Sequence, residues 1–353
     1  MERYIGLDAH TTSCTLAVVG PSGKRLRELV VETSGEALIG TLHSISGQRH
    51  LCIEEGELSG WLYEVLRPHV HRLVVAQPPR GQKGPKSDKI DAYQWAEQLR
   101  INAIETKVFK APSRYPALRE LGRTYRIVSQ DLVRAKNRLK SLYRRRGVYV
   151  SGNGLYVREK QKTWLEKLPV SAQVAAQTLH AEVDSLAGLK SKVQDNLLAE
   201  ATKHAIVKTL MTAPGLGAIR VAQLVPIVVT PHRFRTARHF WSYCGLGIVM
   251  RSSSDWVQLA DGGWIRAEIK QTRGLNKNRS AVLKYLFKGA ATTVISQQAG
   301  QSPLRDSYQR LLDCGTKPNL AKLTIARKIA AAVLRMWKEE KPYDPEAHRA
   351  LLK

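Results

Sequence analysis

The sequence lacks the features that would assign it to several common classes of protein. Its four cysteines form no CxxC pair, which argues against a zinc knuckle and against a disulfide framework. No apolar run reaches the roughly 20 residues that span a bilayer, and the N-terminus has no signal-peptide apolar core. We therefore expect a cytosolic protein whose cysteines are small, buried side chains.

Signatures of nucleotide-driven enzymes are also missing. The segment 81–87 contains glycine, lysine and serine, but not in the adjacent order and spacing of a P-loop. Gly215 and Gly217 lack the third glycine of a dinucleotide fingerprint. These absences argue against an ATP-driven machine. If a protein that does not use ATP breaks and rejoins DNA, it must conserve the energy of the phosphodiester bond, either in a covalent protein–DNA ester or by direct transesterification.

Acidic residues are few relative to basic ones. The 353 residues include 56 Lys and Arg against 30 Asp and Glu, a net charge of +26. Hydrophobic residues make up 43% of the chain, which argues against a wholly disordered basic protein. An excess of this size favours a polyanionic partner, above all nucleic acid, with a membrane surface as the weaker alternative. The length indicates two or three domains.

The first part of the chain has the pattern of an α/β domain, which we place at residues 1–112. Short strands are predicted at 4–8, 14–19 and 26–31, and further strands at 51–53 and 73–76 alternate with helices. Another helix is predicted to begin near Lys89. A three-strand meander followed by alternating helices and strands implies a mixed sheet flanked by helices.

A basic helical segment is predicted for residues 113–205. Apolar residues recur alternately three and four positions apart, as in a heptad seam, at Leu118, Leu121, Tyr125, Val128, Leu132, Ala135, Leu139 and Leu142. Cations that could bind nucleic acid lie beside this seam at Arg134, Lys136, Arg138, Lys140, Arg144, Arg145 and Arg146. A second amphipathic helix covers about 179–197. The two helices could form an antiparallel pair within the chain or a coiled coil in a dimer.

The last part, residues 206–353, is predicted to be mostly α-helical, ending in an Ala-rich helix at about 320–337. It opens with the turn Pro214–Gly217, which is similar to the turn of a helix-hairpin-helix. Its glycines, Gly215 and Gly217, could let backbone amides approach a phosphate. An ordinary connection between two helices is the alternative.

Four carboxylates are candidates for one metal site. Asp8 and Glu54 each follow a predicted buried strand, and Asp88 and Asp91 are three apart, on one face of a helix. A cluster of four would repel itself unless a cation filled it, and oxygen ligands alone favour Mg²⁺ or Mn²⁺ over zinc. Alternatively, Asp88 and Asp91 pair with neighbouring lysines on a solvated helix face.

A second polar concentration contains the serines of the segment 251–255, which reads Arg-Ser-Ser-Ser-Asp. A serine becomes a nucleophile only with a base, a metal or a dense positive field nearby. Such a field could come from Arg251, Lys270, Arg273, Lys277 and Arg279. The alternative is a turn or a helix cap.

These motifs, in this order, resemble the DEDD transposases of bridge-RNA-guided insertion sequences, which are relatives of the pilin-gene invertase. The first half of the resemblance rests on Gly6–His10, Ile53–Gly56 and Lys86–Ala92. The second half rests on Ala213–Gly217, Cys244–Leu246, Arg251–Ser254 and Thr272–Asn276. Together the motifs extend over nearly the whole chain.

The resemblance implies a RuvC-like domain of the RNase H fold, in which Asp8, Glu54, Asp88 and Asp91 are catalytic and bind Mg²⁺. It implies a coiled-coil dimerisation element and a C-terminal serine that attacks DNA to form a phosphoserine intermediate, with metal and serine meeting across protomers of a dimer or tetramer. It further implies that a noncoding bridge RNA pairs with donor and target DNA. The expected location is the bacterial cytoplasm, at the nucleoid.

Two departures from the family pattern leave assignments open. The usual Ser-Gly is replaced by Ser253-Ser254-Asp255, and alignment from Gly245 favours Ser253 as the nucleophile, with Ser252 next. The acidic segment is one residue shorter than usual, so Glu55 is an alternative ligand to Glu54. Two other functions also stay open: a RuvC-type metal nuclease acting on branched DNA with structural serines, and non-catalytic nucleic-acid binding.

Overall fold

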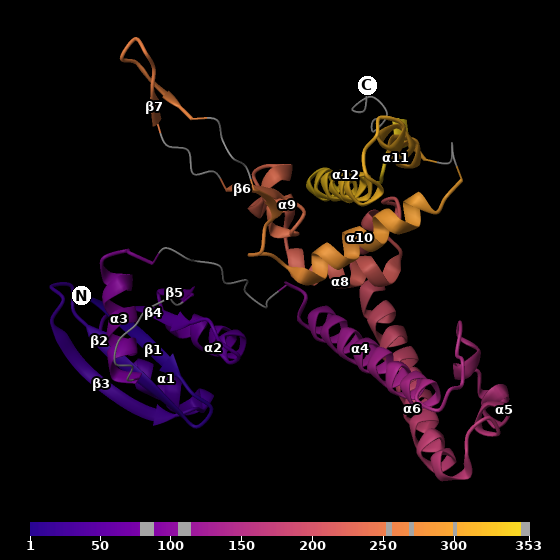
Figure 1. Ribbon diagram of the computed structural model, residues 1–353. Coiled ribbons are helices and arrows are strands. Elements are labelled where there is room, and N and C mark those ends of the chain that lie inside the picture. The colour runs from indigo at the N-terminus through magenta and orange to yellow at the C-terminus, as the bar shows by residue number, and fades with distance from the viewer. Residues whose placement is uncertain (78–87, 105–113, 252–255, 268–271, 299–301, 347–353) are drawn as a thin grey trace. The chain divides into compact units, whose positions relative to one another are not determined.

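The protein divides into two compact units, Met1–Arg114 and Tyr115–Lys353, in a computed structural model (Figure 1). The structure describes all residues except 78–87, 105–113, 252–255, 268–271, 299–301 and 347–353. The first unit is a mixed α/β sheet domain and the second is mostly helical, as expected. The proposed division of the second unit near residue 205 stays a prediction.

The first unit is built on a five-stranded sheet in the order β3-β2-β1-β4-β5. Its strands are β1 (Glu2–Ala9), β2 (Ser13–Val19), β3 (Arg25–Glu32), β4 (Gln48–Glu54) and β5 (Arg72–Ala76). Its helices are α1 (Gly35–His43), α2 (Ser59–Leu66) and α3 (Asp88–Arg100). The meander β1-β2-β3 is antiparallel, whereas β1, β4 and β5 are parallel to one another. The sequence pattern therefore predicted the mixed sheet correctly.

Both faces of the sheet are covered, because side chains alternate along each strand. On one face, Ile5, Leu7 and their neighbours pack against α1 and α2. On the other face, Cys52, Val74 and Ala76 pack against Trp95 and further residues of α3. The helix α3 thus lies across the middle of the second face, over β1, β2 and β4.

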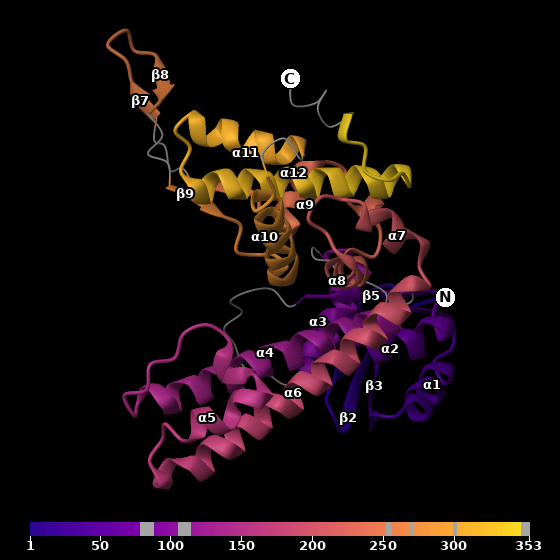
Figure 2. The same ribbon diagram turned by 90° about the vertical axis from the view of Figure 1, so that its right-hand side faces the viewer.

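The second unit begins with two long helices, α4 (Pro116–Arg144) and α6 (Val170–Thr202), which lie side by side (Figure 2). Their contact buries Leu132, Leu139 and Val183, together with Tyr143. The predicted seam of α4 is therefore occupied within the chain, by α6 from Leu132 onward and by the main core of the second unit at Leu118 and Leu121. This is the intramolecular pair that the sequence left open as one of two readings, and a coiled coil between protomers stays a prediction.

The rest of the second unit packs around one large apolar core that also takes in the start of α4 and the end of α6. The connecting helix between the long pair is α5 (Gln161–Leu165), and the later helices are α7 (Ala205–Met211), α8 (Ala218–Val228), α9 (Ala237–Tyr243), α10 (Ala281–Ile295), α11 (Pro303–Asp313) and α12 (Pro318–Glu339). The predicted Ala-rich terminal helix is α12, whose inner face is fully buried against α10, α9 and α11.

Two short antiparallel ribbons interrupt these helices. The first pairs β6 (Ile248–Arg251) with β9 (Thr272–Leu275), and the second pairs β7 (Trp256–Gln258) with β8 (Trp264–Arg266). No strand was predicted in this part of the chain. The β6-β9 ribbon is anchored at its base, where the amide of Asn276 donates to the carbonyl of Gly247 at 3.1 Å.

Two further expectations concerned the burial of the cysteines and the lack of a run long and apolar enough to span a bilayer. Cys14, Cys52 and Cys244 are buried, as expected, but Cys314 is exposed, so the prediction of four buried cysteines was wrong for one of them. It lies at the end of α11, where the chain turns before α12. Within the described residues, no helix combines the length and apolar character that crossing a bilayer requires.

Candidate functional site

Asp8 and Glu54 lie on neighbouring parallel strands, at the ends where those strands leave the sheet. The register pairs Leu7 with Ile53, so the two acids are the next residues on β1 and β4. By alternation, Asp8 shares the sheet face of Gly6, and Glu54 shares that of Cys52. This is the face covered by α3. The sequence prediction that both acids follow buried strands is therefore confirmed, and they share one sheet edge.

Gly6 sets how closely α3 lies on this face. A Cβ atom at Gly6 would stand 1.9 Å from the carbonyl oxygen of Ala92 and 2.7 Å from the amide nitrogen of Ala96. Only a residue without a side chain permits this approach. Ala92 and Ala96 are themselves fully buried, so small residues on both sides bring the helix backbone against the strand.

The buried face of α3 leads back to the other two acids. Ala92, Trp95 and Leu99 recur at helical spacing and are buried against the sheet. One turn toward the N-terminus, the same spacing reaches Asp88 and Asp91. Asp91 is half-buried, whereas the side chain of Asp88 lies outside the described part of the structure. Both acids thus belong to the first turn of the helix, and the half-buried Asp91 lies next to its sheet-facing side.

The acids on the strands have defined neighbours. The indole Nε1 of Trp95 donates to Oε2 of Glu54 at 3.4 Å, which holds this carboxylate against α3. Oδ2 of Asp8 lies 3.5 Å from Nε2 of His10, and the Asp8 side chain is only 13% exposed. Glu55, by contrast, is exposed, and its amide is bonded to the carbonyl of Ala76 at 2.8 Å. These contacts favour Glu54 over Glu55 as the residue facing α3.

The donor set fits a hard divalent cation in its chemistry, since all four candidates are carboxylates. Among the described side chains, no three or more His, Cys, Asp or Glu residues are grouped closely enough to hold a metal ion. Asp8, Glu54 and Asp91 therefore do not form such a site by themselves, and Asp88 would have to complete it.

The serine candidates Ser252, Ser253 and Ser254 lie outside the described residues, as do Asp255 and Lys270. What the structure places is the strand that leads to them, because β6 ends at Arg251, directly before the triplet. Arg251 pairs in register with Thr272 at the far end of the ribbon from Asn276. The side chains of Arg251 and Arg273 are not described, although both residues lie in these strands.

Gly215 and Gly217, the glycines of the predicted helix-hairpin-helix turn, occupy different surroundings. Gly215 has a φ of +73°, and a Cβ there would stand 2.3 Å from the carbonyl oxygen of Ala290 in α10. Its own carbonyl accepts from Nη1 of Arg220 at 2.8 Å. A Cβ at Gly217, just before α8, would meet nothing within 4 Å. Packing between helices therefore accounts for Gly215, whereas Gly217 has free space around it as far as the described residues extend.

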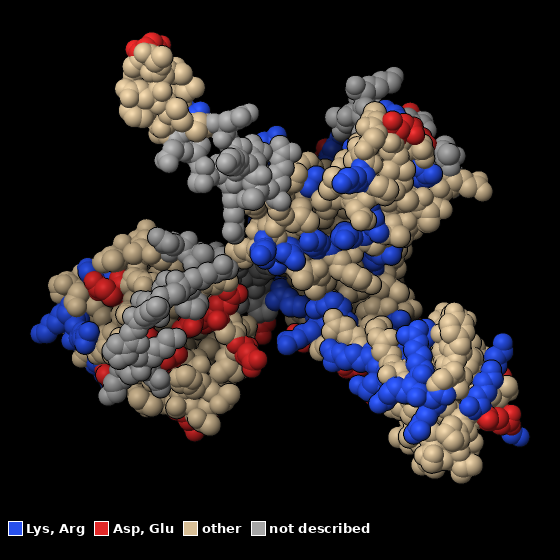
Figure 3. Space-filling view, viewed as in Figure 1, with Lys and Arg blue, Asp and Glu red and all other residues tan. Residues whose placement is uncertain are grey.

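The cations of α4 fall into two groups. Arg134 pairs with Asp131, Arg138 pairs with Glu182 of α6, and Nζ of Lys136 lies over the ring of Tyr156 at 4.7 Å. Lys140 is half-buried, whereas Arg144, Arg145 and Arg146, at the end of the helix, are exposed. Figure 3 shows Lys and Arg gathered over α4 and also over α10. The three terminal arginines are the best placed of the predicted set to meet a phosphate backbone.

A second set of cations was missed by the sequence reasoning. Lys284 and Lys288 of α10 and Lys322 of α12 line one hollow together with Arg279, which was predicted. Lys277, also predicted, is exposed in the preceding loop. The spacing of Lys284 and Lys288, one helical turn apart, was the available signal, but such a pair on a helix is usually an ordinary solvated face.

Comparison with known proteins gives two matches. A family model for transposases, named for the DEDD transposases of IS110, matches residues 5–145. A second, described as the transposase IS116/IS110/IS902 family, matches residues 207–308. No curated protein matches the chain. The first match contains all four candidate carboxylates, and the second contains the serine triplet and most of the cationic hollow.

Proposed function

Since the chain is a DNA transposase that carries both domains of the IS110 family, we propose that it cuts and rejoins DNA strands through a phosphoserine intermediate. The observation that carries the proposal is the convergence of Asp8 and Glu54 at one sheet edge, beneath the helix whose first turn holds Asp88 and Asp91. The topology and this edge also support a RuvC-like domain of the RNase H type.

The four acids would hold a divalent cation, Mg²⁺ or Mn²⁺, which the family implies. When bound, the ion would supply positive charge beside the scissile phosphate. Trp95 orients Glu54 by its hydrogen bond, and the close seat of α3 on Gly6 fixes the helix that carries the other two carboxylates. The chain itself thus holds Glu54 and the backbone of α3 in place before any ion binds.

The nucleophile in this proposal is Ser253, or Ser252 in its place. Its Oγ bonds to the scissile phosphorus while the bond from phosphorus to one DNA oxygen breaks. The serine gives up its proton, the departing DNA oxygen gains one, and that strand end is released as a hydroxyl. When the hydroxyl of the exchanged strand attacks the same phosphorus, the serine leaves again and the strand is resealed. One phosphodiester is exchanged for another at each step, so no ATP is needed. This agrees with the absence of a P-loop from the sequence.

The partners follow from the same proposal. Donor and target DNA are the substrates, and a noncoding bridge RNA would select their sequences by base pairing. A homodimer or tetramer would bring the serine of one protomer to the acids of another. The long helices support an assembly, because α4 exposes the apolar side chains of Ile127 and Val133, each about half accessible. The bacterial cytoplasm, at the nucleoid, is the proposed location.

The deciding experiment is recovery of the covalent adduct. Protein copurified with its RNA is incubated with Mg²⁺ and DNA, and DNA-linked peptides are mapped by mass spectrometry. We expect a linked peptide from 252–254 that Ser253→Ala abolishes, or Ser252→Ala if that serine acts. Ser302, which caps α11, gives a control, since Ser302→Ala must leave the adduct intact. One discrete RNA should copurify, and random cellular RNA in its place would contradict RNA guidance.

A RuvC-type nuclease on branched DNA is the second candidate, and the half-buried acids under α3 are the observation in its favour. Under that function, cleavage requires Mg²⁺ but leaves no protein on the DNA, and alanine at Ser252 and Ser253 does not reduce it. If Asp8→Ala leaves a DNA mobility shift unchanged, and no metal supports cleavage by the unaltered protein, neither enzyme function holds and plain binding is left.

A further inference from the structure

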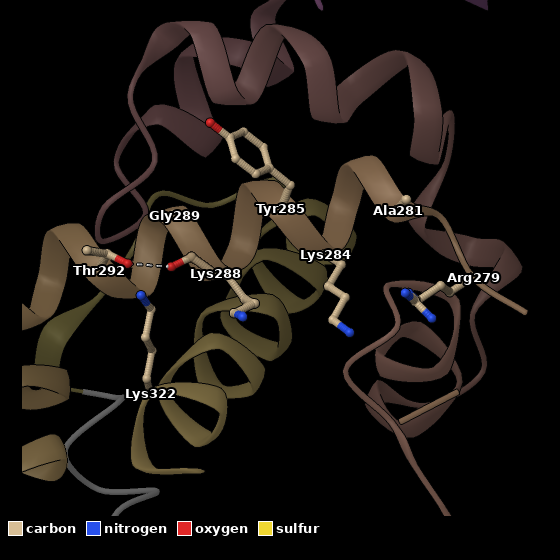
Figure 4. A pocket seen from close by; sticks show the side chains of 8 residues that line it. All are labelled: Arg279, Ala281, Lys284, Tyr285, Lys288, Gly289, Thr292 and Lys322. Carbon is tan, nitrogen blue, oxygen red and sulfur yellow. Dashed lines mark hydrogen bonds between the residues drawn. The ribbon is translucent and has the colours of Figure 1, made fainter. Parts of the chain in front are cut away.

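A hollow of about 430 Å³ lies at the start of α10, between that helix and α12. Four cations line it, and Figure 4 shows them approaching from three places: Arg279 from the loop before α10, Lys284 and Lys288 from α10, and Lys322 from α12. Tyr285 of α10 also lines the hollow, and in this view its side chain leaves the helix on the other side from those of Lys284 and Lys288. Positive charges from separate elements therefore line one hollow.

Arg279 is held in place by the chain around it. Its Nη1 donates to the carbonyl of Asn276 at 3.0 Å, and Nδ2 of Asn276 donates to Oγ of Ser242 at 2.7 Å. Gly245 makes room for it, since a Cβ there would stand 1.9 Å from Cδ of Arg279. A guanidinium fixed in this way loses little conformational entropy when it binds a ligand.

No carboxylate neutralises these charges within the described part of the chain. None of the ion pairs found there involves Arg279, Lys284, Lys288 or Lys322. The Nε of Arg279 is buried and has no hydrogen-bond partner among the described residues. Partial burial, with the charges of Arg279 and Lys288, lowers the pKa of Lys284. An anion in the hollow would relieve this repulsion.

The hollow is linked by a short, hydrogen-bonded path to the strand that precedes the serines. Asn276, which holds Arg279, also closes the base of the β6-β9 ribbon. From that base the strand runs through β6 to Arg251, three residues beyond Ile248 and therefore about 10 Å away. A ligand held in the hollow would thus lie beside the ribbon that carries the proposed nucleophile.

We propose that this hollow is a phosphate-backbone site of the C-terminal domain, where Arg279, Lys284, Lys288 and Lys322 bind a phosphodiester of a nucleic acid strand. The inference rests on the nucleic-acid substrate of the proposed function. Charged oxygens of a phosphodiester match both a fixed guanidinium and flexible ammonium groups. The strand can belong to DNA or to RNA, because both present the same phosphodiester.

The test is the salt dependence of binding. The full chain carrying both Lys284→Gln and Lys288→Gln is titrated with duplex DNA and, separately, with single-stranded RNA at several salt concentrations, in EDTA. Each phosphate contact that is lost should lower the slope of log K against log salt by about 1. We expect a total reduction of about 2 with the nucleic acid that occupies the hollow, so the two titrations identify the source.

The control removes the same charge elsewhere, with Lys192→Gln and Lys208→Gln, both exposed on α6 and α7. Lys322→Gln provides an independent variant on the other helix. If both pocket variants retain the slope of the control with DNA and with RNA, the hollow is not a phosphate site. Binding in EDTA requires neither the serine nor the carboxylates, so failure of the phosphoserine mechanism leaves this outcome unaffected.

Discussion

Replacing Gly6 by alanine should displace α3 from the sheet. The new Cβ would lie 1.9 Å from the backbone oxygen of Ala92, whereas ordinary contacts begin at 3.4 Å. The helix would therefore have to move away by about 1.5 Å, and neither backbone can yield as a flexible side chain would. Overpacking of this kind costs about 1–3 kcal/mol. We expect Gly6→Ala to lower the free energy of unfolding of the first unit by that amount.

The effect on activity should be larger than the effect on stability. Asp88 and Asp91 lie in the first turn of α3, so any movement of the helix moves them relative to Asp8. A misplacement of about 1 Å can reduce the rate of an enzyme about a hundredfold. We expect metal-dependent DNA cleavage by Gly6→Ala to fall by roughly that factor at a temperature where the variant remains folded.

Hydrogen exchange and the free energy of unfolding together test this reasoning. Hydrogen exchange followed by mass spectrometry should show faster exchange in peptides of α3, while α1 on the opposite face of the sheet is unchanged. Gly40→Ala is the matched control, because a Cβ there meets nothing within 4 Å and the position is helical, so a gain of about 0.5–1 kcal/mol is expected. If the exchange rates of α3 and the free energy of unfolding are the same in Gly6→Ala as in the unaltered protein, the close packing of α3 on Gly6 is refuted.

Three more predictions concern the second unit and the thiols. In the native protein one cysteine per chain, Cys314, should react with a thiol reagent, and the other three only after denaturation, because they are buried; two or more fast-reacting thiols would contradict this. Burial lowers the pKa of His180 in the folded protein, so below about pH 6.5 the unfolded state binds more protons than the folded state. The folded protein therefore loses stability as the pH falls. Between pH 7.5 and 5, the melting temperature of His180→Leu should fall less than that of the unaltered protein. Gly245→Ala and Arg279→Gln should both weaken nucleic-acid binding, because the Cβ added at Gly245 would occupy the space of the Arg279 side chain; binding by Gly245→Ala equal to that of the unaltered chain would argue against this positioning role.

Hydrophobic patterning predicted the first unit well because its strands are short apolar runs whose centres are buried on both faces of the sheet. The meander and the crossover to β4 and β5 followed from the short apolar runs at 4–8, 14–19, 26–31, 51–53 and 73–76, which lie between turn signals. The pairing of Asp8 with Glu54 at one edge was also predictable, since parallel strands end together. The packing of α3 on Gly6 was not predictable, because a glycine in a strand indicates that another element approaches closely but does not identify that element.

The second unit was harder to predict beyond its long helices. The sequence did not predict the β6-β9 ribbon because its strands are only four residues long, β6 is followed by serines, and β9 contains a glycine, and both residue types are typical of turns. The cationic hollow joins Lys288 to Lys322, which are 34 positions apart and on different helices. Nothing local in a sequence distinguishes such lysines from those of a solvated surface, so only the packing of α10 on α12 identifies them.

Glycines in the motifs serve packing more than direct ligand contact. A Cβ at Gly6, Gly215 or Gly245 would stand 1.9, 2.3 or 1.9 Å from an atom of another element. In each case a charged residue near the glycine is held in place: Asp8 on the same strand face, Arg220 by its bond to the carbonyl of Gly215, and Arg279 beside Gly245. The glycine determines how closely two elements approach, and that approach fixes where the charge lies. Substitution of these glycines should therefore impair function by misplacing an intact charged side chain, which restoring charge elsewhere cannot repair.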